Sequence, residues 1–130
     1  MKELLIGGWN LIDFYSLEGE FKKRWKGSEK GILIYTIDGF VSVAINRQPE
    51  IEKLNETDKL RLDFFYSGTY EVNESTVIHK IEFSNIGTLI NKAIFRKYTI
   101  INNVLILEGM GLGEQVVLKW EKINPSTIQK

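Results

Sequence analysis

Hydrophobic and polar residues alternate with period two along most of the chain, which is the pattern of half-buried β-strands. The clearest example spans residues 66–83, where two alternating runs flank a turn at Asn73-Glu74-Ser75, and we predict a β-hairpin there. The opposite faces of both runs are largely polar, so the other faces should turn inward and carry the chain's single histidine with them. The residues on these inward faces are Tyr66, Gly68, Tyr70, Val72, Val77, His79, Ile81 and Phe83.

Further strands are predicted over residues 9–17, 32–37, 40–45, 92–101, 104–108 and 115–123. Asp38-Gly39 and Asn102-Asn103 have the composition of tight turns and should join neighbouring strands as hairpins. The strands at 32–37 and 40–45 are apolar on both faces, which predicts packing on both sides. We interpret residues 21–28 as a charged connection and Gly109–Gly113 as a glycine-rich turn.

In the segment 50–65 the hydrophobic residues no longer alternate with the period of two that is typical of strands. Asn55 or Thr57 could cap a helix that places Leu60, Phe64 and Phe65 on one side. We therefore predict one short helix, from about Glu50 to Phe65, that covers a mouth or a flank of the fold.

About eight strands with one helix predict an all-β fold, a single antiparallel up-and-down β-barrel. Closure of the sheet removes exposed strand edges. A barrel of about this strand number can just enclose one small ligand. The 130 residues should form one domain, 1–130, because the chain contains no linker, repeat or low-complexity segment.

Composition and charge limit the kinds of molecule that we expect this protein to bind. Seventeen basic residues balance seventeen acidic ones, so net charge gives no reason to expect nucleic acid or an anionic membrane. The chain has no cysteine, which excludes disulfides and thiolate chemistry, and one histidine is a poor basis for a zinc site. We expect no metal and no cofactor. No apolar run has the length of a signal peptide core or a membrane span, so cytoplasmic residence is the default expectation.

His79 and Arg96 are the polar residues that the alternation sends inward. A neutral His79 could hydrogen-bond a ligand or act as a general base, or it could be a core histidine satisfied by a tyrosine hydroxyl or a backbone carbonyl. Arg96 shares its face with Ile94, Tyr98 and Ile100. Burial of a guanidinium without a partner costs on the order of several kcal/mol. An interior carboxylate, a tyrosine ring or an anionic ligand should therefore lie beside Arg96.

By the same alternation, Asp13 is the one acid on the inward faces, so a structural Arg96–Asp13 pair competes with an anionic ligand. A position of Arg96 at the barrel rim is a further alternative. Tyrosines combine an apolar ring with a polar tip and suit the wall of a ligand cavity. The candidate ligand-binding residues are Tyr35, Tyr66, Tyr70, His79, Arg96 and Tyr98, and no residue is singled out as catalytic.

Several segments together resemble a known family. The Gly-x-Trp opening within Leu5–Leu11 resembles that of lipocalins and their calycin relatives. Residues 31–44, 66–72 and 77–82 are similar to the bacterial and fungal lipocalin-like domain family, and Phe95-Arg96-Lys97-Tyr98 and residues 118–122 extend the similarity. The resemblance implies a compact β-barrel with a small interior cavity, and His79, Arg96 and the tyrosines match recurrent polar positions of that family. This chain has Lys122 where the family often has arginine.

Three hypotheses follow. The first, which we favour, is a binding barrel for a small apolar or aromatic molecule with a polar or anionic end. The second is an isomerase- or cyclase-type enzyme in which His79 is the general base and Arg96 or Tyr70 stabilises an enolate-like charge. The third is a filled structural barrel without a ligand. In any of these cases we expect Trp9 to plug the closed end of the barrel, with Lys122 or Trp120 nearby. A homodimer is left open by the sequence.

Overall fold

The computed structural model describes residues 2–18, 21–24, 30–46, 63–111 and 114–123. Within these ranges the chain forms nine β-strands and two short 3-10 turns, η1 (Lys2–Leu4) and η3 (Gly87–Leu89). The strands are β1 (Gly7–Glu18), β2 (Phe21–Arg24), β3 (Lys30–Tyr35), β4 (Phe40–Asn46), β5 (Asp63–Asn73), β6 (Thr76–Ser84), β7 (Ala93–Ile101), β8 (Val104–Gly111) and β9 (Glu114–Lys122). Neither of the two described helical turns is long or apolar enough to cross a bilayer.

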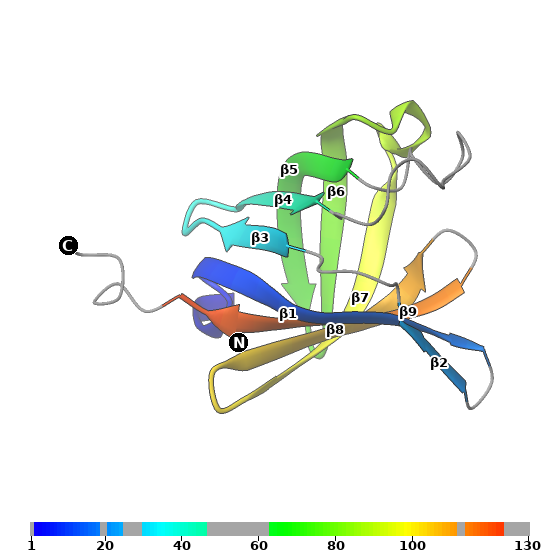
Figure 1. The fold of residues 1–130 in the computed structure, drawn as a ribbon. Coiled ribbons are helices and arrows are strands. Elements are labelled where there is room, and N and C mark those ends of the chain that lie inside the picture. Colours follow the sequence, from blue (N-terminus) through cyan, green and yellow to red (C-terminus); the bar gives the residue numbers. More distant parts are fainter. Residues whose placement is uncertain (1, 19–20, 25–29, 47–62, 112–113, 124–130) are drawn as a thin grey trace.

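The strands form a closed antiparallel barrel. Sequence neighbours pair from β3 to β9, and β9 pairs back onto β1 along almost the whole length of β1 (Figure 1). The other edge of β1 is shared, because Gly7–Asn10 pairs with β3 while Tyr15–Glu18 pairs with the short β2. The closed wall therefore contains eight strands, and β2 extends from one end of it. This confirms the predicted all-β, up-and-down barrel.

The predicted hairpins are confirmed, and their turn residues have the expected backbone. Gly39 lies at φ +98° between β3 and β4, while Asn102 and Asn103 lie at φ 49° and 67° between β7 and β8. Glu74, also at positive φ, turns the chain from β5 into β6. Two residues join β5 to β6 and β7 to β8, while four residues, Thr36 to Gly39, join β3 to β4; each turn sets the register of its strand pair.

Three predicted element boundaries are wrong. Residues 63–65 begin β5 instead of ending a helix, because Asp63, Phe64 and Phe65 pair with β4; residues 50–62 of that predicted helix lie outside the described residues. Gly109–Gly111 continues β8 instead of forming a turn. Part of the predicted connection, Phe21–Arg24, is strand β2. In each case pairing with a neighbouring strand overrides the local sequence preference.

The inward faces form the core, as the alternation predicts, with two exceptions, Phe83 on β6 and Asp13 at a bulge of β1. His79 and Arg96 are 1% and 8% exposed, but Phe83 is 65% exposed. The reason is a β-bulge: Ser67 faces Phe83 and Gly68 faces Ile81, so Glu82 is an extra residue in β6 and the alternation reverses beyond it.

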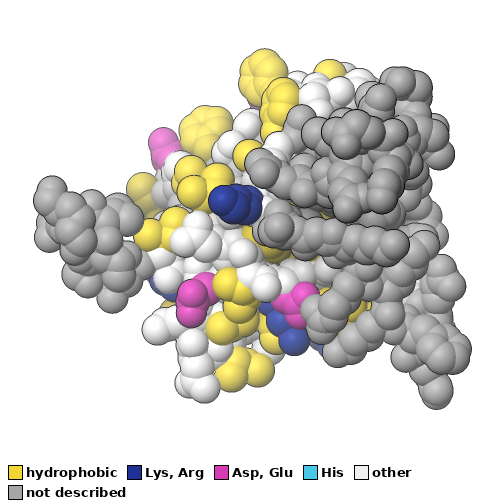
Figure 2. Space-filling model, viewed as in Figure 1, with side chains coloured by type: hydrophobic (Ala, Val, Ile, Leu, Met, Phe, Trp, Pro, Cys, Tyr) yellow, Lys and Arg dark blue, Asp and Glu magenta, His cyan; other side chains and the backbone are white. Residues whose placement is uncertain are grey.

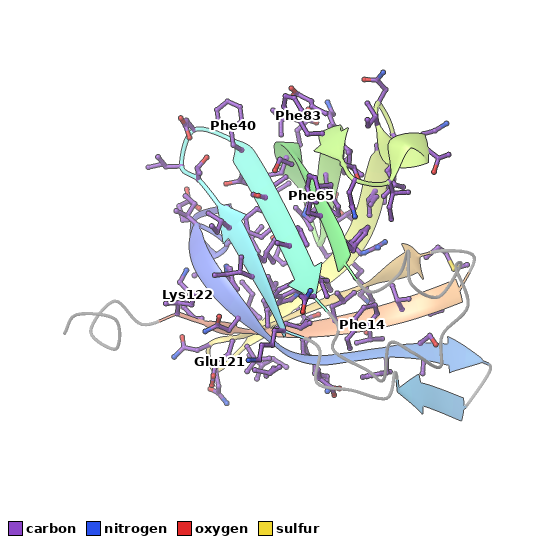
Figure 3. The ribbon with its side chains drawn as sticks, turned by 45° about the horizontal axis from the view of Figure 1, so that its top comes forward. Phe14, Phe40, Phe65, Phe83, Glu121 and Lys122 are labelled. Carbon is purple, nitrogen blue, oxygen red and sulfur yellow. The ribbon has the colours of Figure 1, made fainter. Side chains whose placement is uncertain are left out.

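The outer side of β3 and β4 is not packed as predicted. Ile32, Ile34 and Phe40 are at least 40% exposed, so among the described residues only the inner faces of these strands are buried. Figure 2 shows hydrophobic side chains gathered at the top of the view, near the ends of β4, β5 and β6, and Figure 3 labels Phe40, Phe65 and Phe83 in this region. The prediction of two-sided burial for these strands is therefore wrong within the described part of the chain.

Candidate functional site

Two tyrosines hold His79 inside the barrel from opposite edges of its ring. The Tyr35 hydroxyl lies 2.7 Å from Nε2 and the Tyr66 hydroxyl lies 2.5 Å from Nδ1. All three side chains are buried. We call this hydrogen-bonded chain, Tyr35–His79–Tyr66, the relay. It corresponds to the sequence alternative of a core histidine satisfied by tyrosine hydroxyls, and it orients the imidazole rigidly.

The relay assembles from strands that are distant in the sequence. Tyr35 ends β3, Tyr66 lies on β5 and His79 lies on β6, while β4 runs between the two tyrosines. Tyr70 is the cross-strand partner of His79 and packs edge-on against Tyr35, with ring centroids 4.7 Å apart. The Tyr70 hydroxyl donates to the carbonyl oxygen of Thr36 at 2.8 Å. Tyr70 therefore supports the relay through its ring, and its hydroxyl bonds to the backbone.

Burial keeps the relay uncharged. Desolvation, with a smaller contribution from the Arg96 charge, lowers the pKa of His79 to about 3. Desolvation likewise raises the pKa of Tyr35 and of Tyr66 well above the usual value, and Arg96 opposes both shifts. At neutral pH the imidazole and both phenols are consequently neutral, and the cationic side chain that acts on them is Arg96.

Arg96 projects from β7 toward the backbone of β8. Its Nη1 donates to the carbonyl oxygen of Met110 at 2.9 Å and, more weakly, to that of Phe95 at 3.3 Å. Opposite it stands Gly109, on which a Cβ would lie only 2.7 Å from Nη1. Burial lowers the pKa of Arg96 while Tyr66 and Tyr35 raise it, and a guanidinium remains protonated in proteins.

Asp13 is not the partner of Arg96, so that sequence alternative is wrong. A β-bulge at Ile12 lets Leu11 face Trp120 and Asp13 face Lys119, and the alternation of β1 reverses there. Phe14, and not Asp13, then packs against the core. Within the described ranges no carboxylate forms an ion pair with Arg96. The described residues that hydrogen-bond the Arg96 guanidinium do so through the backbone carbonyls of Phe95 and Met110.

The six candidate residues differ in how closely the structure brings them together. His79 is hydrogen-bonded to Tyr35 and Tyr66, and Tyr70 packs edge-on against Tyr35. Arg96 is near enough to shift the pKa of all three relay members. Tyr98 is half-buried against the core on the strand that carries Arg96. Sequence reasoning missed Gly109 and the Met110 carbonyl. The sequence feature that could have indicated them is the run Gly109-Met110-Gly111, because glycines leave room for a large side chain on the neighbouring strand.

The end of the barrel near the N-terminus is closed by a different cluster. Trp9 is buried and its Nε1 donates to the carbonyl oxygen of Leu5 at 2.9 Å. Lys122 places its ammonium 4.6 Å from the centroid of the Trp9 ring and donates to the carbonyl oxygen of Ile6. Lys122 thus supplies a cation above the face of Trp9.

A groove of about 200 Å³ lies on the outside of the barrel, across β3 to β6. Its walls include Ile34, Phe40 and Phe83, and its lining contains none of the relay residues. It carries one ionisable side chain, Glu82. The relay and Arg96 therefore lie outside this groove. Among the described residues, no group of three or more histidine, aspartate or glutamate side chains could hold a metal ion.

Comparison with known proteins places this barrel in a family. A family model described as a lipocalin-like domain matches residues 6–123. Two crystal structures of mutants of the fluorescent protein UnaG are similar, each with a TM-score of 0.49; the identities are 11% and 10%, covering 94% and 95% of this chain and 98% and 99% of theirs. A comparison with curated proteins found no match. Since the family model spans nearly the whole chain, this protein belongs to the lipocalin-like domain family.

Proposed function

We propose that this protein is a binding barrel for one small apolar or aromatic molecule that carries an anionic end, and that the anionic end pairs with Arg96. The observation that carries the proposal is the buried guanidinium for which the described residues supply no carboxylate. An unpaired buried charge is costly, and a ligand carboxylate or enolate would offset that cost. Tyr35, Tyr66, Tyr70, His79 and Tyr98 would contribute the remaining wall of the site.

The apolar part of the ligand would provide most of the affinity. Burial of apolar surface contributes roughly 25 cal/mol per Å² before the costs of association. Arg96 would then fix the orientation of the ligand, because charge-assisted hydrogen bonds are short and directional. This division of roles, an apolar wall with a few polar groups, is typical of small-molecule sites.

His79 itself favours binding over general-base catalysis. Both ring nitrogens are already hydrogen-bonded to tyrosines, and a pKa of about 3 makes the imidazole a weak base at neutral pH. An isomerase using His79 as the base would have to act through a tyrosine hydroxyl. We therefore propose that the protein binds its ligand without converting it.

Calorimetric titration with cinnamate and with methyl cinnamate tests the proposal, because the two differ in charge and little in shape. We expect the wild-type protein to prefer cinnamate, and Arg96→Met to weaken cinnamate roughly 10- to 100-fold while leaving the ester nearly unchanged. Lys97→Met is the matched control, since Lys97 is the exposed neighbour on the same strand. Equal affinity for the two compounds, or equal losses in the two variants, would refute the pairing with Arg96.

Native mass spectrometry of freshly purified protein provides an independent check. A retained anionic molecule that the Arg96→Met variant loses would support the proposal and identify the ligand. Absence of binding of any titrated compound, with no retained molecule, would favour the filled structural barrel instead.

A further inference from the structure

The relay contains one more hydrogen-bond donor than it has internal hydrogen bonds. Each tyrosine brings one hydroxyl proton and a neutral imidazole brings one N–H, which makes three donors. The relay contains two hydrogen bonds, one at each ring nitrogen of His79. In one of them the imidazole donates to a tyrosine oxygen, and in the other a tyrosine donates to the imidazole. The tyrosine that accepts from His79 therefore keeps its own hydroxyl proton.

No described residue accepts this third proton. The only hydrogen-bond partner of the Tyr35 and Tyr66 hydroxyls within the described ranges is His79. Both tyrosines are buried, and a buried donor without an acceptor is unfavourable because it has lost its hydrogen bond to water. The described interior thus holds a hydroxyl proton that no oxygen of the described residues receives.

One further interior donor of the described residues is in the same condition. Trp120, on β9, is 1% exposed, and its indole N–H lacks a hydrogen-bond partner. The described interior therefore contains a second spare donor besides that of the relay, which suits a ligand rich in acceptor oxygens.

The position of the spare proton depends on the tautomer of His79. When Nδ1 carries the imidazole proton, Tyr66 accepts it and Tyr66 keeps the spare hydroxyl proton; when Nε2 carries it, Tyr35 does. The two arrangements contain the same three protons, and neither of them is charged. Conversion moves the hydroxyl proton of one tyrosine onto His79 and the His79 proton onto the other tyrosine; it is complete when the second tyrosine releases its spare hydroxyl proton to solvent and the first takes one up. The relay can therefore present its one donor at either of two hydroxyls, which lie on opposite sides of the imidazole ring.

We propose that the relay is a neutral hydrogen-bond donor, placed on one tyrosine or the other by the His79 tautomer, and that it recognises a second acceptor oxygen of the ligand, a carbonyl or an enol or phenol oxygen, separate from the anionic end at Arg96. This inference rests on the proposed binding function and specifies the ligand class as an apolar or aromatic molecule with both an anionic group and a carbonyl-type oxygen. The ligand oxygen would select the histidine tautomer in which the tyrosine facing it holds the spare hydroxyl proton.

The test uses a neutral pair that cannot engage Arg96 as an ion, propiophenone and propylbenzene. Wild-type protein should bind the ketone about tenfold more tightly than the hydrocarbon. Either Tyr35→Phe or Tyr66→Phe, whichever removes the tyrosine that faces the ketone, should abolish the preference. The control Tyr15→Phe, a buried tyrosine outside the core cluster, should keep it. Nitrogen NMR of the labelled His79 ring should show one tautomer with the ketone and no such change with the hydrocarbon.

The two proposals fail in different ways. If cinnamate binds in an Arg96-dependent manner while propiophenone shows no advantage over propylbenzene, or does not bind, the relay inference is wrong and the binding function stands. A ketone preference that survives both single tyrosine variants, or a histidine tautomer that the ketone leaves unchanged, also overturns it. If none of the compounds binds, the binding function itself is refuted.

Discussion

Gly109 gives the guanidinium of Arg96 its place. The two residues lie opposite each other on β8 and β7, and a Cβ built on Gly109 would come within 2.7 Å of both Arg96 Nη1 and the Phe95 carbonyl oxygen. One of these atoms is backbone and cannot move aside cheaply. The absence of a side chain at Gly109 therefore lets Arg96 lie close against β8 and bond to Met110.

Gly109→Ala should accordingly move Arg96 and weaken the barrel. We expect a loss of about 1–3 kcal/mol in the free energy of unfolding, as for other overpacked sites, and a weaker affinity for cinnamate with little change for methyl cinnamate. Chemical denaturation and calorimetry measure the two effects. Gly87→Ala is the matched control, because a Cβ at Gly87 meets nothing within 4 Å. Similar behaviour of the two variants would contradict the close approach.

Stability should increase with pH across the weakly acidic range because of His79. Its pKa is about 3 in the folded protein and near 6.5 when unfolded. Between these values the unfolded chain binds the extra proton, so stability is fully present above about pH 6.5 and falls as the pH drops toward 3. The expected slope approaches about 1 kcal/mol per pH unit. Denaturant midpoints between about pH 5 and 7 measure it, above the range where most carboxylates titrate.

The His79→Gln variant isolates this effect. Glutamine does not titrate, and its amide can still donate to one tyrosine and accept from the other. Since His79 is the chain's one histidine, the slope above about pH 5 should flatten in this variant. A variant with the wild-type slope would show that other groups cause the pH dependence.

Alkaline titration should distinguish Tyr35 and Tyr66 from the other tyrosines, because the two relay tyrosines should ionise at higher pH. Burial raises the pKa of Tyr35 and Tyr66, so their neutral forms stabilise the fold below about pH 10 and this stability is lost as the pH rises through their folded values. Tyrosinate absorbance of the native protein should therefore fall short of the five-tyrosine signal seen in denaturant until the barrel unfolds. Early ionisation of all five tyrosines in the folded protein would be inconsistent with a buried relay.

Trp9→Ala should remove the plug at the closed end of the barrel. Trp9 is buried, bonds to Leu5 and lies beneath the ammonium of Lys122, so its truncation should cost roughly 3–5 kcal/mol. Phe83→Ala is the comparison, since Phe83 is a large but mostly exposed aromatic residue and its loss should change stability by about 0.5 kcal/mol or less. Thermal or denaturant melts of the two variants provide the measurement, and a Trp9 variant as stable as wild type would exclude the plug.

Much of the barrel could be predicted from local patterns. Side chains alternate in any strand, so the runs around Tyr66, His79 and Arg96 revealed both the strands and the inward direction of these residues. The Asp38-Gly39 and Asn102-Asn103 turns likewise depend on the backbone freedom of a few adjacent residues. The helix prediction failed over Asp63–Phe65 because pairing with β4 decided the conformation of those residues.

The chain by itself determined the inward direction of most core residues, because the period of a strand is a property of neighbouring residues. Only the tertiary structure decided what those residues meet. Tyr35 reaches His79 across 44 positions of sequence, and bulges at Ile12 and Glu82 turned Asp13 and Phe83 away from the faces that simple alternation assigns them. Hydrogen bonds across the barrel and register shifts between strands depend on the closed sheet as a whole, so no local pattern contains them.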